Sequence, residues 1–159
     1  MAKDGTGPLS KAGMNVGIKF NPDRLIVNTL KSHCMLDYAK AEGKQDLLAE
    51  NLFAAYFEQG KNINSVDVLA KVAVDTGLNL ENMEKHLKDS SVVSRVQEEA
   101  MEAQGEGVHG VPHFNIQLRG EHQRIATFSG AQPPETFKSI FQRLLTKLKS
   151  EFRMKLPKL

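Results

Sequence analysis

A single cysteine, Cys34, sets the limit on the thiol chemistry of this sequence. One cysteine excludes an intramolecular disulfide, a CxxC redox pair and a zinc site built from several cysteines. Cys34 follows Asn28 and Thr29, two residue types that favour the start of a helix. A lone cysteine inside a helix is typical of a structural thiol that packs against its neighbours. We therefore predict a structural role for Cys34.

Three of the five histidines, His33, His109 and His113, raise the question of a metal site. A zinc ion needs roughly three or four ligand groups. His109 and His113 flank a proline, and the residues around them do not complete such a set. We predict no metal and no cofactor, and we expect His33 to line the packing surface of a helical domain.

The most specific stretch is Gly-Val-His-Gly-Val-Pro-His-Phe-Asn-Ile at 107–116, followed by Phe-Ser-Gly-Ala-Gln-Pro at 128–133. Together they resemble the end of a DsbA-like thioredoxin domain, in which this loop leads through two strands to a final helix. Upstream, Asn28-Thr29 with His33 and Leu36 is similar to the opening of the helical insertion in the FrnE-like branch of that family. The resemblance runs from about residue 13 to residue 149.

The resemblance implies a substrate-binding loop made of His109, Gly110, Val111 and Pro112. In thioredoxin folds the bond before this proline is cis and faces the redox cysteines. Such a bond exposes the backbone of the preceding residue, here Val111, to an extended peptide or a small thiol. Without the resemblance, Gly-Val-Pro predicts only a rigid turn into a strand, because most X-Pro bonds are trans.

The family's redox cysteines have no counterpart in this sequence. In the family, a strand, a CxxC at the start of a helix and a second strand precede the helical insertion. The first 22 residues contain no cysteine and are too few for such a unit, which needs about 30 residues or more. We expect the chain to begin inside the insertion, without the CxxC-bearing half, and we assign no catalytic residue.

The elements that position these residues make a mainly helical α+β fold. Amphipathic segments separated by Gly and Asn predict a bundle of short helices. After residue 106 the period changes to two at 113–118, which predicts a strand that pairs with 125–128. The expected divisions are a loop-rich segment at 1–22, a DsbA-type helical insertion at 23–106, a partial thioredoxin unit with a hairpin and a helix at 107–153, and a basic tail at 154–159.

Basic residues gather at the C-terminal end of the sequence. From 138 to 159 there are seven basic residues and one acid, whereas the first 137 residues hold 14 basic and 18 acidic ones. A basic helix suits phosphate or anionic lipid, but no aromatic residues are interleaved for base stacking, so we expect no nucleic acid. No apolar run approaches the roughly 20 residues of a membrane span. With no visible secretory signal, we predict a cytoplasmic protein.

Strand 113–118 would be central in a complete thioredoxin sheet. Without a parallel neighbour it leaves an open edge, and an isolated hairpin is marginal in water. We therefore predict self-association through this strand.

Three functions stay open at this stage. One is a protein of the thiol–disulfide oxidoreductase lineage that is redox-impaired because it lacks CxxC. The second is a non-catalytic module that binds a peptide or a hydrophobic ligand. The third is a relative of glutathione-linked isomerases and transferases. Whether the chain is an enzyme is undecided.

Overall fold

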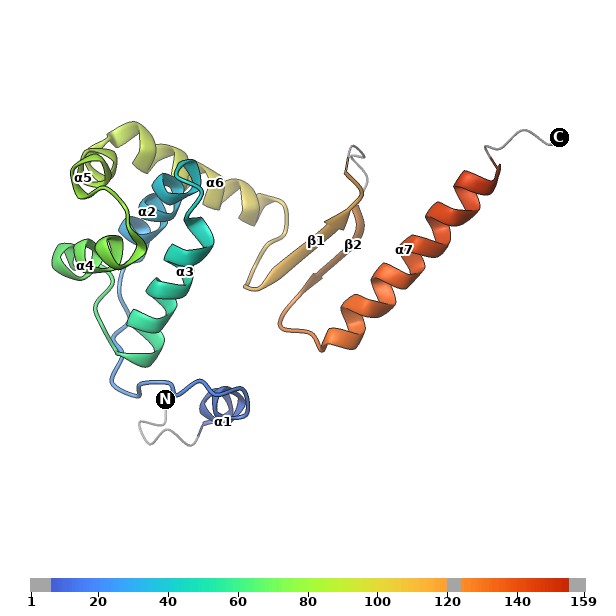
Figure 1. Ribbon diagram of the computed structural model, residues 1–159, viewed down its shortest axis with the longest axis horizontal. Coiled ribbons are helices and arrows are strands. Elements are labelled where there is room, and N and C mark those ends of the chain that lie inside the picture. Colours follow the sequence, from blue (N-terminus) through green and yellow to red (C-terminus); the bar gives the residue numbers. More distant parts are fainter. Residues whose placement is uncertain (1–6, 120–123, 155–159) are drawn as a thin grey trace. The chain divides into compact units, whose positions relative to one another are not determined.

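The computed structural model describes residues 7–119 and 124–154, so most of the predicted tail lies outside it (Figure 1). The chain divides into two compact units, residues 1–101 and 102–159. The helices of the first unit are α1 (Pro8–Met14), α2 (Leu30–Ala41), α3 (Gln45–Phe53), a π-helical turn (Ala54–Glu58), α4 (Val66–Thr76), α5 (Leu80–Lys88) and most of α6 (Ser90–Gly105). The second unit holds β1 (His113–Gln117), β2 (Arg124–Ser129) and α7 (Pro134–Met154).

Local capping groups set several of the helix ends in the first unit. The Asn79 side chain accepts a 2.9 Å hydrogen bond from the Asn82 amide at the start of α5. Gly77 ends α4 with a φ of +73°, a left-handed conformation that glycine adopts without steric cost. At the start of α6, Asp89 accepts hydrogen bonds from the Ser91 hydroxyl and amide, and these two bonds lower its carboxyl pKa.

A single apolar core holds the first unit together. It is built by residues from α2 to α5, and its least exposed large side chains are Met35, Leu48, Leu69 and Met83, each at most 1% exposed. Burying one such side chain stabilises the fold by about 1.5–3 kcal/mol. The Ser32 hydroxyl, 3% exposed, donates to the Ile63 carbonyl at 2.9 Å, so this buried polar group is also satisfied.

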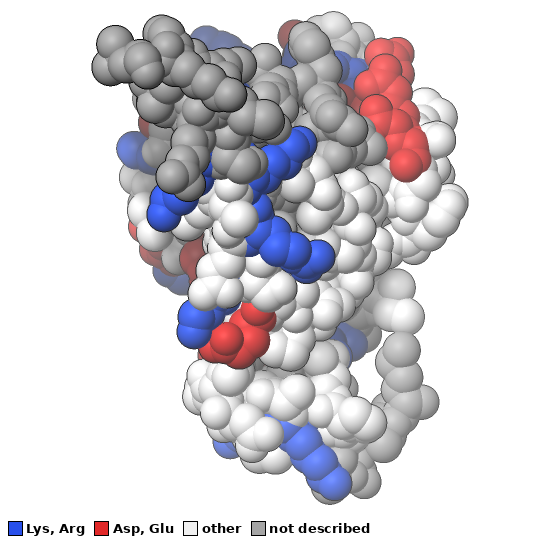
Figure 2. Space-filling model, turned by 90° about the vertical axis from the view of Figure 1, so that its right-hand side faces the viewer, with Lys and Arg blue, Asp and Glu red and all other residues white. Residues whose placement is uncertain are grey.

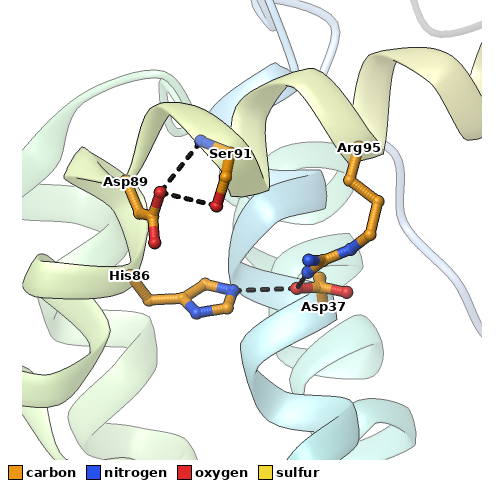
Figure 3. A network of polar contacts seen from close by, with 5 residues as sticks. All are labelled: Asp37, His86, Asp89, Ser91 and Arg95. Carbon is orange, nitrogen blue, oxygen red and sulfur yellow. Dashed lines mark hydrogen bonds and ion pairs between the residues drawn. The ribbon is translucent and has the colours of Figure 1, made fainter.

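A carboxylate on α2 ties two other helices to it (Figure 3). Asp37, which is 21% exposed, accepts a 2.8 Å hydrogen bond from Nε2 of His86 on α5. The same oxygen accepts from the guanidinium of Arg95 on α6. Hydrogen bonds to charged groups are worth more than neutral ones, especially where water is partly excluded. Asp37 therefore joins α5 and α6 to α2.

The second unit is an antiparallel hairpin covered by one helix. β1 pairs with β2 with His113 opposite Ser129 and Asn115 opposite Thr127, and the register shifts between Ile116 and Gln117. The predicted strand at 113–118 is thus one residue shorter, because the bulge precedes its end. Period-two alternation separates the polar residues from the apolar ones on opposite faces.

Helix α7 covers the apolar face of the hairpin. The Phe137 ring lies 5.0 Å from that of Phe114 and 5.4 Å from that of Phe128. Ile140 and Leu144 are 7% and 8% exposed. The outward side of α7 carries exposed lysine and arginine, and basic side chains recur along it in Figure 2.

The predicted fold class, a mainly helical α+β fold with a hairpin and a C-terminal helix, is confirmed. Over residues 7–119 and 124–154, no helix combines the length and apolarity that crossing a membrane requires.

Replacing Asp37 with Asn should lower the free energy of unfolding by about 1–3 kcal/mol, because the two charge-assisted hydrogen bonds to His86 and Arg95 are lost. Urea unfolding followed by circular dichroism measures the change. Asp75→Asn is the matched control, since its ion pair with Lys71 is solvent-exposed and worth roughly 0–1 kcal/mol. Equal losses in the two variants would contradict the role given to Asp37.

Candidate functional site

The predicted binding residues form one exposed loop between α6 and β1. Gly107, with a φ of +88°, turns the chain out of α6. The Val111–Pro112 peptide bond is cis. The Pro112 carbonyl accepts a 2.8 Å hydrogen bond from the amide of Gly130, just after β2. The end of the loop is therefore fastened to the far strand of the hairpin.

The loop presents its apolar side chain to solvent. Val111 is 89% exposed, among the most exposed large hydrophobic side chains of the described residues. His109, Gly110 and Pro112 are also exposed. A Cβ placed on Gly110 would meet no atom within 4 Å, so there is space beside the loop for another molecule. The Val111 side chain is therefore available for contact with another molecule.

Polar side chains line the hairpin face next to this loop. Nδ1 of His113 lies 2.7 Å from the Ser129 hydroxyl oxygen, and the Thr127 hydroxyl donates to the Asn115 side-chain oxygen at 3.0 Å. Both contacts join residues that lie directly opposite each other on the two strands. Sequence reasoning missed these pairs, because they depend on the register of the hairpin and on its bulge.

The hairpin also offers backbone groups. Within the described residues the sheet has only two strands, so the outer edge of each strand lacks a partner strand. Such an edge can pair with an extended segment through main-chain hydrogen bonds. Together, the loop and the adjacent edge of β1 provide an apolar contact and a row of donors and acceptors.

Cys34 belongs to the first unit, where its side chain is buried. It is 1% exposed, in agreement with the structural role predicted for it. Burial, together with the negative charge of Asp37, raises the pKa of the thiol above its usual range, and Arg95 opposes this only in part. The reactive species in thiol chemistry is the thiolate. At neutral pH Cys34 is therefore both inaccessible and protonated.

The structure places His33 differently from the expectation. Its side chain is exposed rather than packed, and Nδ1 lies 2.8 Å from the Thr29 carbonyl, one turn earlier in α2. The helix turns Cys34 toward the core and its neighbour toward solvent. Among the residues with described positions, no three His, Cys, Asp or Glu side chains gather closely enough to hold a metal ion.

Cys34 should react with a disulfide reagent such as 5,5′-dithiobis(2-nitrobenzoate) at least about 100-fold more slowly than an exposed cysteine, since only the exposed thiolate reacts. The variant Cys34→Ala/Lys40→Cys, with its thiol on the exposed side of α2, is the control. Fast labelling of the native protein would contradict the burial.

The raised pKa of Cys34 also predicts how the stability of the fold depends on pH. Below the ordinary pKa of a thiol the protonated Cys34 stabilises the fold, and this contribution is lost as the pH rises above about 9. Cys34→Ala should lack that loss of stability at alkaline pH.

Comparison with known proteins places this geometry in a family. No curated protein sequence gives a significant match. A solved structure from Nitrosomonas europaea, assigned as a protein disulfide isomerase, superposes with a TM-score of 0.69 over 89% of this chain and 76% of that chain. At 15% identity this likeness establishes the fold alone. A structure from Streptomyces coelicolor, assigned as a DsbA oxidoreductase, has a TM-score of 0.62 at 25% identity and covers 99% of this chain and 67% of that chain. The model of the DSBA-like thioredoxin domain matches residues 9–142, and with the hairpin, loop and final helix in place the chain belongs to that family.

Proposed function

We propose that this chain binds an extended, cysteine-containing peptide or a small thiol at the loop formed by His109, Gly110, Val111 and Pro112, without a redox dithiol of its own. The observation that carries the proposal is the 89% exposure of Val111, two residues before a strand whose outer edge has no partner strand among the described residues. A peptide paired with the edge of β1 would gain main-chain hydrogen bonds, and Val111 would contact an apolar side chain of the peptide.

The cysteine content separates binding from turnover. Thiol–disulfide exchange proceeds by attack of a thiolate on a disulfide sulfur, and reuse of the site requires a second thiol to release the mixed disulfide. The sequence has one cysteine, and its thiol is buried and protonated at neutral pH. We therefore propose a member of the oxidoreductase lineage that holds its ligand without oxidising or reducing it.

Two further assignments belong to this proposal. The Asn28-Thr29 pair followed by His33 and Leu36 supports the FrnE-like branch. A single cysteine among 159 residues suits a reducing compartment, which supports a cytoplasmic site of action.

Val111→Asp should weaken the binding of an extended cysteine-containing peptide by about ten-fold or more, because a charge replaces the apolar contact. Fluorescence anisotropy of a labelled peptide measures the affinity. Val74→Asp is the matched control, since Val74 is 57% exposed on α4 in the other unit and should not affect binding. Equal affinities for the two variants would argue against the loop.

An insulin-reduction assay with dithiothreitol tests the redox part of the proposal. The chain should not accelerate reduction beyond the background rate. Catalysis that persists in Cys34→Ser would show that the chain carries redox chemistry that its cysteine content does not provide.

The same open edge supports self-association through strand 113–118, in which the edge of one copy pairs with that of another. Sedimentation equilibrium at micromolar concentration should show a dimer. Excess peptide should dissociate this dimer, because the peptide and the second copy of the chain compete for the same outer edge of β1. Asn115→Pro should weaken the dimer, because proline cannot donate to a ladder. A monomer whose amides at 113–117 are fully protected from hydrogen exchange would contradict the proposal.

A further inference from the structure

A hollow of about 390 Å³ lies between the end of α3 and one side of α4, entirely within the first unit. We call it the α3–α4 hollow. Its floor is apolar and made of small or branched side chains, with Ala54 and Ala55 on one side and Val68 and Val72 on the other. Its volume lies in the lower part of the range of about 300–1,000 Å³ that is usual for small-ligand sites.

The local backbone accounts for the hollow. α3 continues past Phe53 as a π-helical turn, Ala54–Glu58, which is wider than an α-helical turn. Two alanines stand where the turn faces α4, and neither side chain is long enough to fill the space. Single π-helical turns of this kind occur frequently at functional sites.

Polar side chains surround the floor, and several of their polar groups have no partner within the described part of the chain. Lys61, Asp67 and Gln59 line the hollow, and among the described residues their side chains make no hydrogen bond or ion pair. The Asn51 amide nitrogen donates to Thr76 at 2.9 Å, which leaves its side-chain oxygen available as an acceptor. By contrast, Lys71 and Asp75 on the same rim are paired with each other at 3.0 Å.

The charges on the rim select the class of ligand. Two lysines and two aspartates balance each other, which disfavours a nucleotide phosphate, a polyanion or a divalent cation. Among the described residues, the groups that stay available are the Lys61 ammonium, the Asp67 carboxylate, the Gln59 amide and the side-chain oxygen of Asn51. A ligand that satisfies all of them carries an ammonium, a carboxylate and an amide, and its side chains must be apolar and small enough for the floor.

We propose that the α3–α4 hollow binds a dipeptide with free ends and small apolar side chains. Asp67 accepts from its ammonium group and Lys61 donates to its carboxylate. The side chains of Asn51 and Gln59 hydrogen-bond its amide, and its side chains rest on Ala54, Val68 and Val72. The proposal is independent of the function proposed above, because the hollow and the loop belong to different units.

The probe is L-alanyl-L-valine, titrated into the full ¹⁵N-labelled chain while amide resonances are followed by NMR. Saturable shifts confined to residues 51–61 and 66–76 are expected, with millimolar or tighter affinity. N-acetyl-alanyl-valine amide, which lacks both charges, and valine alone, which lacks the amide, should each bind at least five-fold more weakly. Equal binding of either compound would overturn the assignment of ligand class.

Asp67→Asn and Lys61→Gln should each weaken binding about two- to five-fold, as expected for exposed charges. Glu81→Gln and Lys85→Gln are the matched controls, because these residues form an exposed pair on α5 and should leave the affinity unchanged. Ala54→Leu should abolish binding by filling the floor. If that variant fails to fold, Asp67→Asn and Lys61→Gln still test the proposed site. Absence of saturable shifts, or equal effects of the rim and control variants, would overturn the proposal.

Discussion

The geometry of the exposed loop depends on three phenylalanine rings. A two-stranded hairpin is marginal in water, and its polar face contributes little apolar burial. Phe114 and Phe128 lie opposite each other on the two strands with ring centroids 5.1 Å apart, and Phe137 of α7 meets both edge-on. Such ring pairs add about 0.5–1.5 kcal/mol each beyond the area that they bury. Without this cluster the hairpin would lose its apolar contact with α7, and the end of the loop that leads into β1 would be less firmly held.

The cluster acts on only one face of the hairpin, and that asymmetry shapes what the second unit can bind. The opposite face pairs its own polar groups across the strands, as in the contact between His113 and Ser129. Neither this face nor the outer edges add apolar burial, so an incoming segment finds main-chain groups rather than a hydrophobic pocket. Val111 supplies the apolar contact that is otherwise missing, because it lies on the loop rather than on a paired strand. Recognition by main-chain pairing then requires the extended conformation of a peptide ligand.

Much of this arrangement follows from residue patterns. The alternation of apolar and polar residues at 113–118 predicts a strand, and the glycines at 43, 60 and 77 mark turns that all have positive φ values. The orientation of single helical residues is harder to predict. His33 was expected to pack, yet the helix turns it to solvent while burying Cys34 next to it, since α2 presents only one face to the core. Contacts between distant segments, such as Asp37 with His86 and Arg95, have no signature in a single sequence. They arise only when three helices meet.

The two proposed sites recognise different parts of a peptide. The edge of β1 pairs with main-chain groups in the middle of an extended segment, so chain ends are irrelevant to it. In the α3–α4 hollow, Lys61 and Asp67 have no partner among the residues that the structure describes, so the proposed ligand uses both ends of a very short chain. A long peptide cannot satisfy Lys61 and Asp67 together within about 390 Å³, whereas a dipeptide is too short to form a ladder with a strand. Each site therefore excludes the other's ligand. The hollow excludes a long peptide because of its length, and the strand edge excludes a dipeptide because it can form too few main-chain hydrogen bonds.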